Sequence, residues 1–302
     1  MLSRVAEALY WMGRYIERAE HSARVLEAMR DLRLDLYEVN REVADEQWKG
    51  ALFALSLPDL PIDRLVLDPG EPNSLLCAMS RARENARQVR EVISPEMWEK
   101  LNQQYWVLRE ATTRSVNESM VAEALTGIVS SGFLWDGVTD ATMIRGEGWL
   151  FLKLGKFVER IDAISRLVAA RLSSATPDVT DEHSGNVEWL TLLKSFDALD
   201  AYRKAHPKRV DRRAVVEFLL FETEFPHTLR YSTNTAADLA RRLLRLHPQS
   251  GRGVERDFGR VAARVEYADF DSASAPDSTF LREVVQDVNA GSICLQKTFF
   301  LC

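Results

Sequence analysis

The chain has 302 residues, 46% hydrophobic and 28% charged, and this composition excludes a disordered or fibrous protein. The formal net charge of -6 opposes the broad basic surface that non-specific nucleic-acid binding requires, so we expect no nucleic-acid partner. Cys77, Cys294 and Cys302 form no CxxC motif, and no signal peptide or membrane span is evident, so we expect a cytoplasmic protein without a membrane partner.

Helical periodicity dominates the first half of the chain. Apolar residues recur at steps of three and four from Leu2 to Leu26, as on one face of a helix. Ser74 and Ser94 are suited to be N-caps. Prolines and a glycine between 57 and 73 predict a loop. Within it, a short strand over 64–68 remains an alternative. The helices predicted here cover about 2–37, 43–56, 74–93, 95–108 and 120–135.

A turn at Asp136-Gly137 marks the predicted midpoint, and a long helix capped by Thr139 or Asp140 follows it to about Ser173. The next segment, 174–185, has the composition of a surface loop. Further helical patterns cover about 186–206, 210–221, 228–246, 253–267 and 279 to the end. We therefore predict an all-α, multi-helix bundle.

The strongest signal is an internal repeat. Residues 9–20, LYWMGRYIERAE, align without a gap with residues 151–162, FLKLGKFVERID. The alignment pairs Gly13 with Gly155, Arg14 with Lys156, Glu17 with Glu159, Arg18 with Arg160, Glu20 with Asp162 and Arg24 with Arg166. A fainter match joins 68–75 to 222–229. We therefore predict a pseudo-two-fold repeat within one domain over 1–302, with halves of about 1–138 and 139–302.

The matched residues share one border of a helix's apolar face. At about 100° per residue, Gly13, Glu17 and Glu20 form a stripe. A glycine inside a helix costs roughly 1 kcal/mol relative to alanine, so the two matched glycines suggest close approach of another helix or a ligand. Carboxylates at this border need partners, because an unpaired buried charge is costly. They form either structural ion pairs or a polar cleft; as ion-pair partners we expect Arg81, Arg83 or Arg87.

Three segments resemble a known family. They are MLSRVAEALYWMGRYIERAE at 1–20, SRARENARQVR at 80–90 and TMIRGEGW at 142–149. On these motifs the chain resembles the alpha-E family of bacterial proteins over essentially its whole length. The resemblance implies an all-helical fold with no firmly established activity. It also implies association or fusion with circularly permuted ATP-grasp ligase-like proteins, often with transglutaminase-like peptidases, in a system that makes or modifies peptides through amide bonds.

The candidate site is a polar cleft or an ion-pair network. Its residues are Glu17, Arg18, Glu20, Arg81, Glu84, Asn85, Arg87, Arg145, Glu147, Glu159, Arg160 and Asp162, with Gly13 and Gly155 as close-packing glycines. We predict no metal, because the sequence lacks the Glu-x-x-His pair of helical di-metal sites. We also predict no cofactor, since no Gly-rich phosphate loop occurs. His21 is interpreted as a histidine on the helix surface.

Two functions stay open. The first is a non-catalytic helical partner or scaffold, which holds the ATP-grasp ligase or presents its peptide substrate while the partner performs any ATP-dependent step. The alternative is an enzyme or ligand binder that acts on a peptide or amino-acid-like substrate through the acids and arginines of a Glu/Arg cleft. An open cleft favours the second function, and closed ion pairs favour the first.

Overall fold

The computed structural model describes residues 1–36, 41–113, 116–173, 182–207, 210–268 and 277–301, and over these ranges it contains helices and no strand. The all-α prediction is therefore confirmed. The helices are α1 (Ser3–Leu36), α2 (Arg41–Ala54), α3 (Ile62–Leu67), α4 (Leu75–Gln88), α5 (Pro95–Ala111), α6 (Glu118–Thr142), α7 (Glu147–Ser173), α8 (Glu182–Ser195), α9 (Leu199–Ala205), α10 (Arg212–Phe221), α11 (Leu229–Leu246), α12 (Arg252–Glu266) and α13 (Ser278–Phe299).

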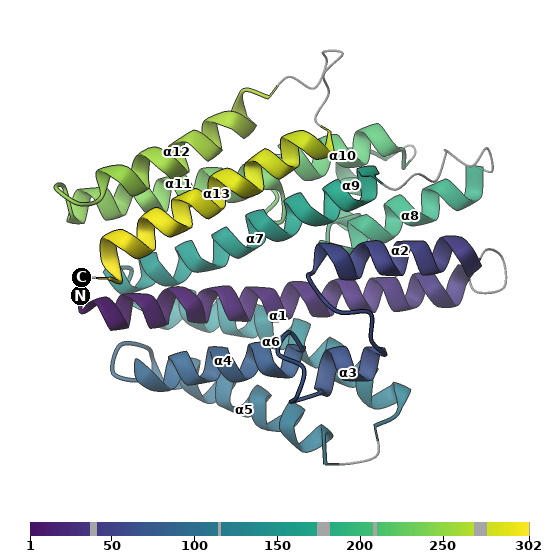
Figure 1. Ribbon diagram of the computed structural model, residues 1–302, viewed down its shortest axis with the longest axis horizontal. Coiled ribbons are helices and arrows are strands. Elements are labelled where there is room, and N and C mark those ends of the chain that lie inside the picture. Colours follow the sequence, from purple (N-terminus) through teal and green to yellow (C-terminus); the bar gives the residue numbers. More distant parts are fainter. Residues whose placement is uncertain (37–40, 114–115, 174–181, 208–209, 269–276, 302) are drawn as a thin grey trace.

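Two long helices, α1 and α7, form the centre of the molecule and lie side by side (Figure 1). Contacts between them advance along both helices, from Gly13 against Leu152 to Glu17 against Arg160, so the helices run in the same direction. Helices α4 and α6 pack on α1 and are joined by α5, whereas α11 and α13 pack on α7 and are joined by α12. The buried apolar side chains of both groups belong to one continuous cluster.

Glycines allow the central helices to approach each other closely. A Cβ added to Gly13 would collide with the backbone carbonyl of Leu152, and one added to Gly155 would collide with that of Tyr10. Because the obstacles are backbone atoms, no side-chain rotation can relieve them. The two contacts are reciprocal, since the alignment that pairs the glycines also pairs Tyr10 with Leu152. Duplication of the two complete halves stays a prediction.

Serine begins α4 and α5 where the sequence indicated, whereas the cap predicted at Thr139 or Asp140 is wrong, because both residues lie inside α6 and α7 begins at Glu147. The side chains of Ser74 and Ser94 accept hydrogen bonds from backbone N–H groups in the first turns of α4 and α5. Thr228 caps α11 in the same way. The Ser74 hydroxyl also donates to the carbonyl of Asp68 at 2.7 Å, and the Thr228 hydroxyl donates to that of Glu222 at 2.6 Å. The faint match between 68–75 and 222–229 thus corresponds to two turns with the same hydrogen bonds.

The prediction of a midpoint turn at Asp136-Gly137 is wrong, because both residues lie inside α6, which continues to Thr142. The predicted boundary near residue 138 therefore falls within a helix. A mid-helix glycine costs about 1 kcal/mol. That cost is offset because the same stretch buries Trp135 and Thr139 and pairs Asp136 with lysines of α7.

Two other local predictions differ from the structure. The segment 64–68, for which the sequence left a short strand as an alternative, lies largely in the short helix α3. Leu65, Val66 and Leu67 of this helix are buried. The helix expected over 186–206 is divided into α8 and α9, because Asp197 adopts a positive φ of 55° between them. Most of the predicted loop 174–185 lies outside the described residues, and α8 begins at Glu182. In the described ranges, no helix has the length and apolar character needed to cross a membrane.

Candidate functional site

The Glu-Arg sequences of the two central helices bind each other crosswise. Arg160 of α7 donates from Nε and Nη2 to the two carboxylate oxygens of Glu17, at 2.5 and 2.9 Å. Arg18 of α1 donates from the same two nitrogens to Glu159, at 2.5 and 3.1 Å. These two contacts, which we call the crossed Glu–Arg pairs, have the bidentate geometry of strong charge-assisted hydrogen bonds. They join α1 to α7 directly beyond the glycine contacts.

Each glutamate of the crossed pairs also has a second cation. Arg14 Nε donates to Glu159 at 2.7 Å, and Lys156 Nζ lies 3.6 Å from Glu17. Arg14 and Lys156 are matched in the sequence alignment, so the second cations are related in the same way as the first. The two carboxylates are 2% and 6% exposed, and each therefore shares a buried site with two positive groups.

Burial and the neighbouring cations act in opposite directions on these carboxylates. Burial alone would raise the pKa of Glu17, but the charges of Arg160 and Lys156 and the hydrogen bonds from Arg160 hold it well below its ordinary value. Burial likewise opposes the effect of Arg14 and Arg18 on Glu159, and the net pKa is again lowered. Both groups stay ionised at neutral pH and are weak bases there.

A second acid follows on each helix, one turn beyond the crossed pair. Arg24 pairs with Glu20 on α1, and Arg166 Nε donates to Asp162 on α7 at 2.7 Å. Burial raises the pKa of Glu20, and the negative charge of Glu17 adds to the increase. Burial also raises the pKa of Asp162. The prediction that Glu17 and Glu20 are buried and contact arginine is confirmed.

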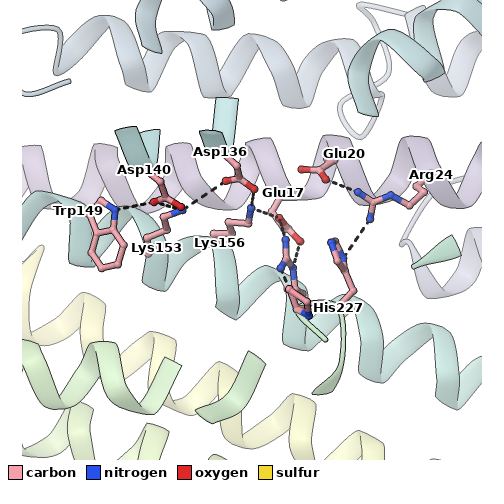
Figure 2. A network of polar contacts seen from close by, with 11 residues as sticks. Glu17, Glu20, Arg24, Asp136, Asp140, Trp149, Lys153, Lys156 and His227 are labelled. Atoms are coloured by element: carbon pink, nitrogen blue, oxygen red, sulfur yellow. Dashed lines mark hydrogen bonds and ion pairs between the residues drawn. The ribbon is translucent and has the colours of Figure 1, made fainter. Parts of the chain in front are cut away.

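On the Glu17 side the ion pairs continue into a network (Figure 2). Lys156 also pairs with Asp136 of α6, and Lys153 lies 3.0 Å from Asp140 on the same helix. At the other end, Arg24 contacts His227 at 3.4 Å. Burial lowers the pKa of His227 well below its ordinary value, and the charges of two nearby arginines add to this effect. The network thus ties α1, α6 and α7 to the segment before α11.

His21 departs from its interpretation as a surface histidine. It is 5% exposed, and its ring stacks on Phe196 with the centroids 5.3 Å apart. Burial, reinforced by the charge of Arg24, lowers the pKa of His21 to about 3, so the ring is neutral at physiological pH. Its Nε2 atom is buried without a hydrogen-bond partner.

The candidate residues on α4 do not join the site. Glu84 and Arg87 are exposed and bind each other, with Arg87 Nη2 2.7 Å from Glu84 Oε1. Asn85 donates to the carbonyl of Arg81 at 3.0 Å, and Arg81 lies over the Tyr15 ring. The expectation that α4 supplies the arginine partners of Glu17 and Glu20 is therefore wrong.

Arg83 is also unavailable to the glutamates of α1. It donates to Asn102 at 2.7 Å and lies against aromatic rings of α5. Although α4 packs on α1, its basic side chains bind Asn102, Glu84 and the Tyr15 ring rather than Glu17 or Glu20. The parallel helix α7 supplies Arg160 in their place.

Arg145 and Glu147 lie at the start of α7, away from the crossed pairs. Arg145 stacks over Trp149, and Glu147 binds the N-terminal amine at 3.0 Å and His247 at 2.7 Å. Between Glu147 and Arg160 the helix rises about 20 Å. Sequence reasoning left Arg14, Lys156, Asp136 and His227 out of the candidate site. The alignment of Arg14 with Lys156 was a usable signal, whereas no sequence pattern pointed to Asp136.

Comparisons with known proteins support one assignment. A family model named Alpha-E, described as a predicted alpha-helical domain with a conserved ER motif, matches residues 1–300. Uncharacterised proteins of Mycobacterium bovis and of a strain of Mycobacterium tuberculosis are each 26% identical to the chain over 259 residues, and one from a second Mycobacterium tuberculosis strain is 25% identical. Each alignment covers 76% of this chain but only 28% of the relative. No solved structure matches the chain. Because the family model extends over residues 1–300, the chain belongs to the Alpha-E family.

Proposed function

We propose that the chain is a non-catalytic helical partner in a peptide-forming or peptide-modifying system. In this role it holds a circularly permuted ATP-grasp ligase or presents the ligase's peptide substrate, with a transglutaminase-like peptidase as a further partner. These partners follow from the resemblance to alpha-E proteins described above. The role needs a rigid helical body with exposed surface and no chemistry of its own.

The closure of the crossed Glu–Arg pairs carries this proposal. Glu17 and Glu159 are 2% and 6% exposed, and each is occupied by two cations. A general base works best when its pKa lies near the operating pH, whereas both of these pKa values are lowered. The paired ER sequences therefore fit a structural clamp between α1 and α7 better than a pair of catalytic acids.

The length of the relatives supports a partner role as well. Since the chain covers 28% of each mycobacterial relative, most of each relative lies outside the match. Covalent linkage keeps two cooperating regions at a high effective concentration, and separate chains must replace that linkage by binding. A helical body that forms only part of each longer relative fits a component that works together with another region or partner.

Reconstitution tests the proposal. The chain is purified with a circularly permuted ATP-grasp protein and a transglutaminase-like peptidase from the same organism, and ATP turnover is measured with and without the chain. We expect a stable complex and turnover that increases when the chain is present. We also expect a folded Glu17→Gln variant to support the same turnover. Absence of a complex together with unchanged turnover would reject the partner role.

A further inference from the structure

A cavity of about 200 Å³ lies beside Glu159. Its polar wall includes Arg14, Arg18, Asn73, Asp162, Arg166 and Asn289. Since one water occupies about 30 Å³ in the liquid, the space holds about six or seven waters. It is smaller than the roughly 300–1,000 Å³ of sites for drug-sized ligands, which points to a molecule of amino-acid size.

The arginines around this cavity retain donors for an anion. Arg18 and Arg166 have side chains that are 37% and 40% exposed, so both are accessible to solvent. The hydrogen bonds of Arg18 to Glu159 use two of its five N–H groups, and the bond of Arg166 to Asp162 uses one. Three arginines face two carboxylates in the wall, which leaves one positive charge in excess. This excess favours a ligand carboxylate near Arg18 and Arg166.

The same wall retains an acceptor for a cation. Asp162 binds Arg166 through Oδ2 alone, and its Oδ1 atom is buried without a hydrogen-bond partner. An unsatisfied buried polar atom costs about 1–3 kcal/mol, and a ligand donor recovers this cost when the 18% exposed Asp162 carboxylate turns Oδ1 toward the cavity. Asp162 and Arg166 are in direct contact, so one small molecule with adjacent positive and negative groups can reach both.

We propose that this cavity binds a free α-amino acid, whose carboxylate is held by Arg18 and Arg166 and whose ammonium group is held by Asp162. The proposal goes beyond the partner role, because it concerns the chain alone and requires neither ligase nor peptidase. Failure of one proposal leaves the other intact.

Calorimetric titration of the full chain tests the inference. Each of the proteinogenic amino acids is added separately, with propionate, ethylamine and inorganic phosphate as probes that carry one kind of charge. We expect at least one amino acid to bind in a 1:1 ratio. Propionate and ethylamine should bind at least about tenfold more weakly, because each loses a charge-assisted hydrogen bond worth about 1.5–3 kcal/mol.

Variants distinguish binding in the cavity from a general effect of surface charge. Asp162→Asn and Arg166→Gln should each weaken binding at least about tenfold for the same reason. The matched controls are Asp238→Asn and Arg241→Gln, which alter an exposed acid–arginine pair of α11 outside the cavity wall and should keep wild-type affinity. Ala163→Leu fills the cavity without changing a charge and should abolish binding in a protein that still folds.

Three outcomes would overturn the proposal. The first is that no amino acid binds to the wild-type chain. The second is that phosphate or propionate binds as tightly as the best amino acid, which would identify a simple anion site. The third is that a folded Ala163→Leu variant binds with unchanged affinity, which would place the ligand elsewhere.

Discussion

Replacing Glu17 with glutamine tests whether the crossed Glu–Arg pairs are structural. The substitution preserves the shape of the side chain and removes its charge. Glu17 accepts two hydrogen bonds from Arg160, which is itself 5% exposed, and it lies 3.6 Å from Lys156. Glu17→Gln therefore leaves a buried guanidinium without its neutralising carboxylate.

The expected loss of stability follows from this burial. Removing one partner of a buried ion pair costs about 3–5 kcal/mol. An unfolding entropy of about 2.1 cal/mol/K per residue gives about 0.6 kcal/mol/K for the 302-residue chain. The Tm should therefore fall by about 5–8 °C. The lower end applies if the glutamine oxygen still accepts one hydrogen bond from Arg160.

Differential scanning calorimetry at neutral pH measures this change. The matched control is Glu84→Gln, which breaks an exposed pair with Arg87 and should change stability by no more than about 0.5 kcal/mol. Glu159→Gln should resemble Glu17→Gln, because it also leaves buried cations unpaired. A Glu17→Gln protein as stable as the Glu84→Gln control, yet inactive in the reconstituted system, would refute the structural interpretation.

Three further predictions concern stability, each measured by thermal unfolding. Gly155→Ala should destabilise by about 1–3 kcal/mol, since its Cβ meets the backbone of α1, whereas Gly137→Ala has open space around it and should stabilise by up to about 1 kcal/mol. Because burial lowers the pKa of His21 to about 3, the unfolded chain binds the extra proton below about pH 6.5. His21 should therefore contribute about 2 kcal/mol to the stability lost between pH 7 and 5, in addition to a loss from His227, and His21→Leu should remove only the contribution of His21. Asp136→Asn should cost less than Glu17→Gln, because Asp136 is half-buried and its lysine partners keep other acids nearby.

Much of the secondary structure was accessible from local sequence patterns. The cap at Ser74 follows from chemistry within a few residues, and the helix after Ser94 follows from the adjacent proline. The burial of Glu17 was also predictable, because the helical period puts it at the border of an apolar face. The turn expected at Gly137 failed because the pairing of Asp136 with lysines of α7 is not a local property.

Tertiary structure decided the partners of the buried acids. Glu17 could have met arginines of α4, which also packs on α1, or those of α7. The alignment of Arg18 with Arg160 was visible in the sequence, but it did not say that the two helices pack in parallel with Gly13 and Gly155 at their contact. Sequence periodicity defines which face of a helix is buried, whereas the choice among facing helices depends on packing over the whole core. For the same reason, the cavity beside Glu159 exists only in the folded arrangement, where the wall residues come from α1, α2, α4, α7, α13 and the segment between α2 and α4.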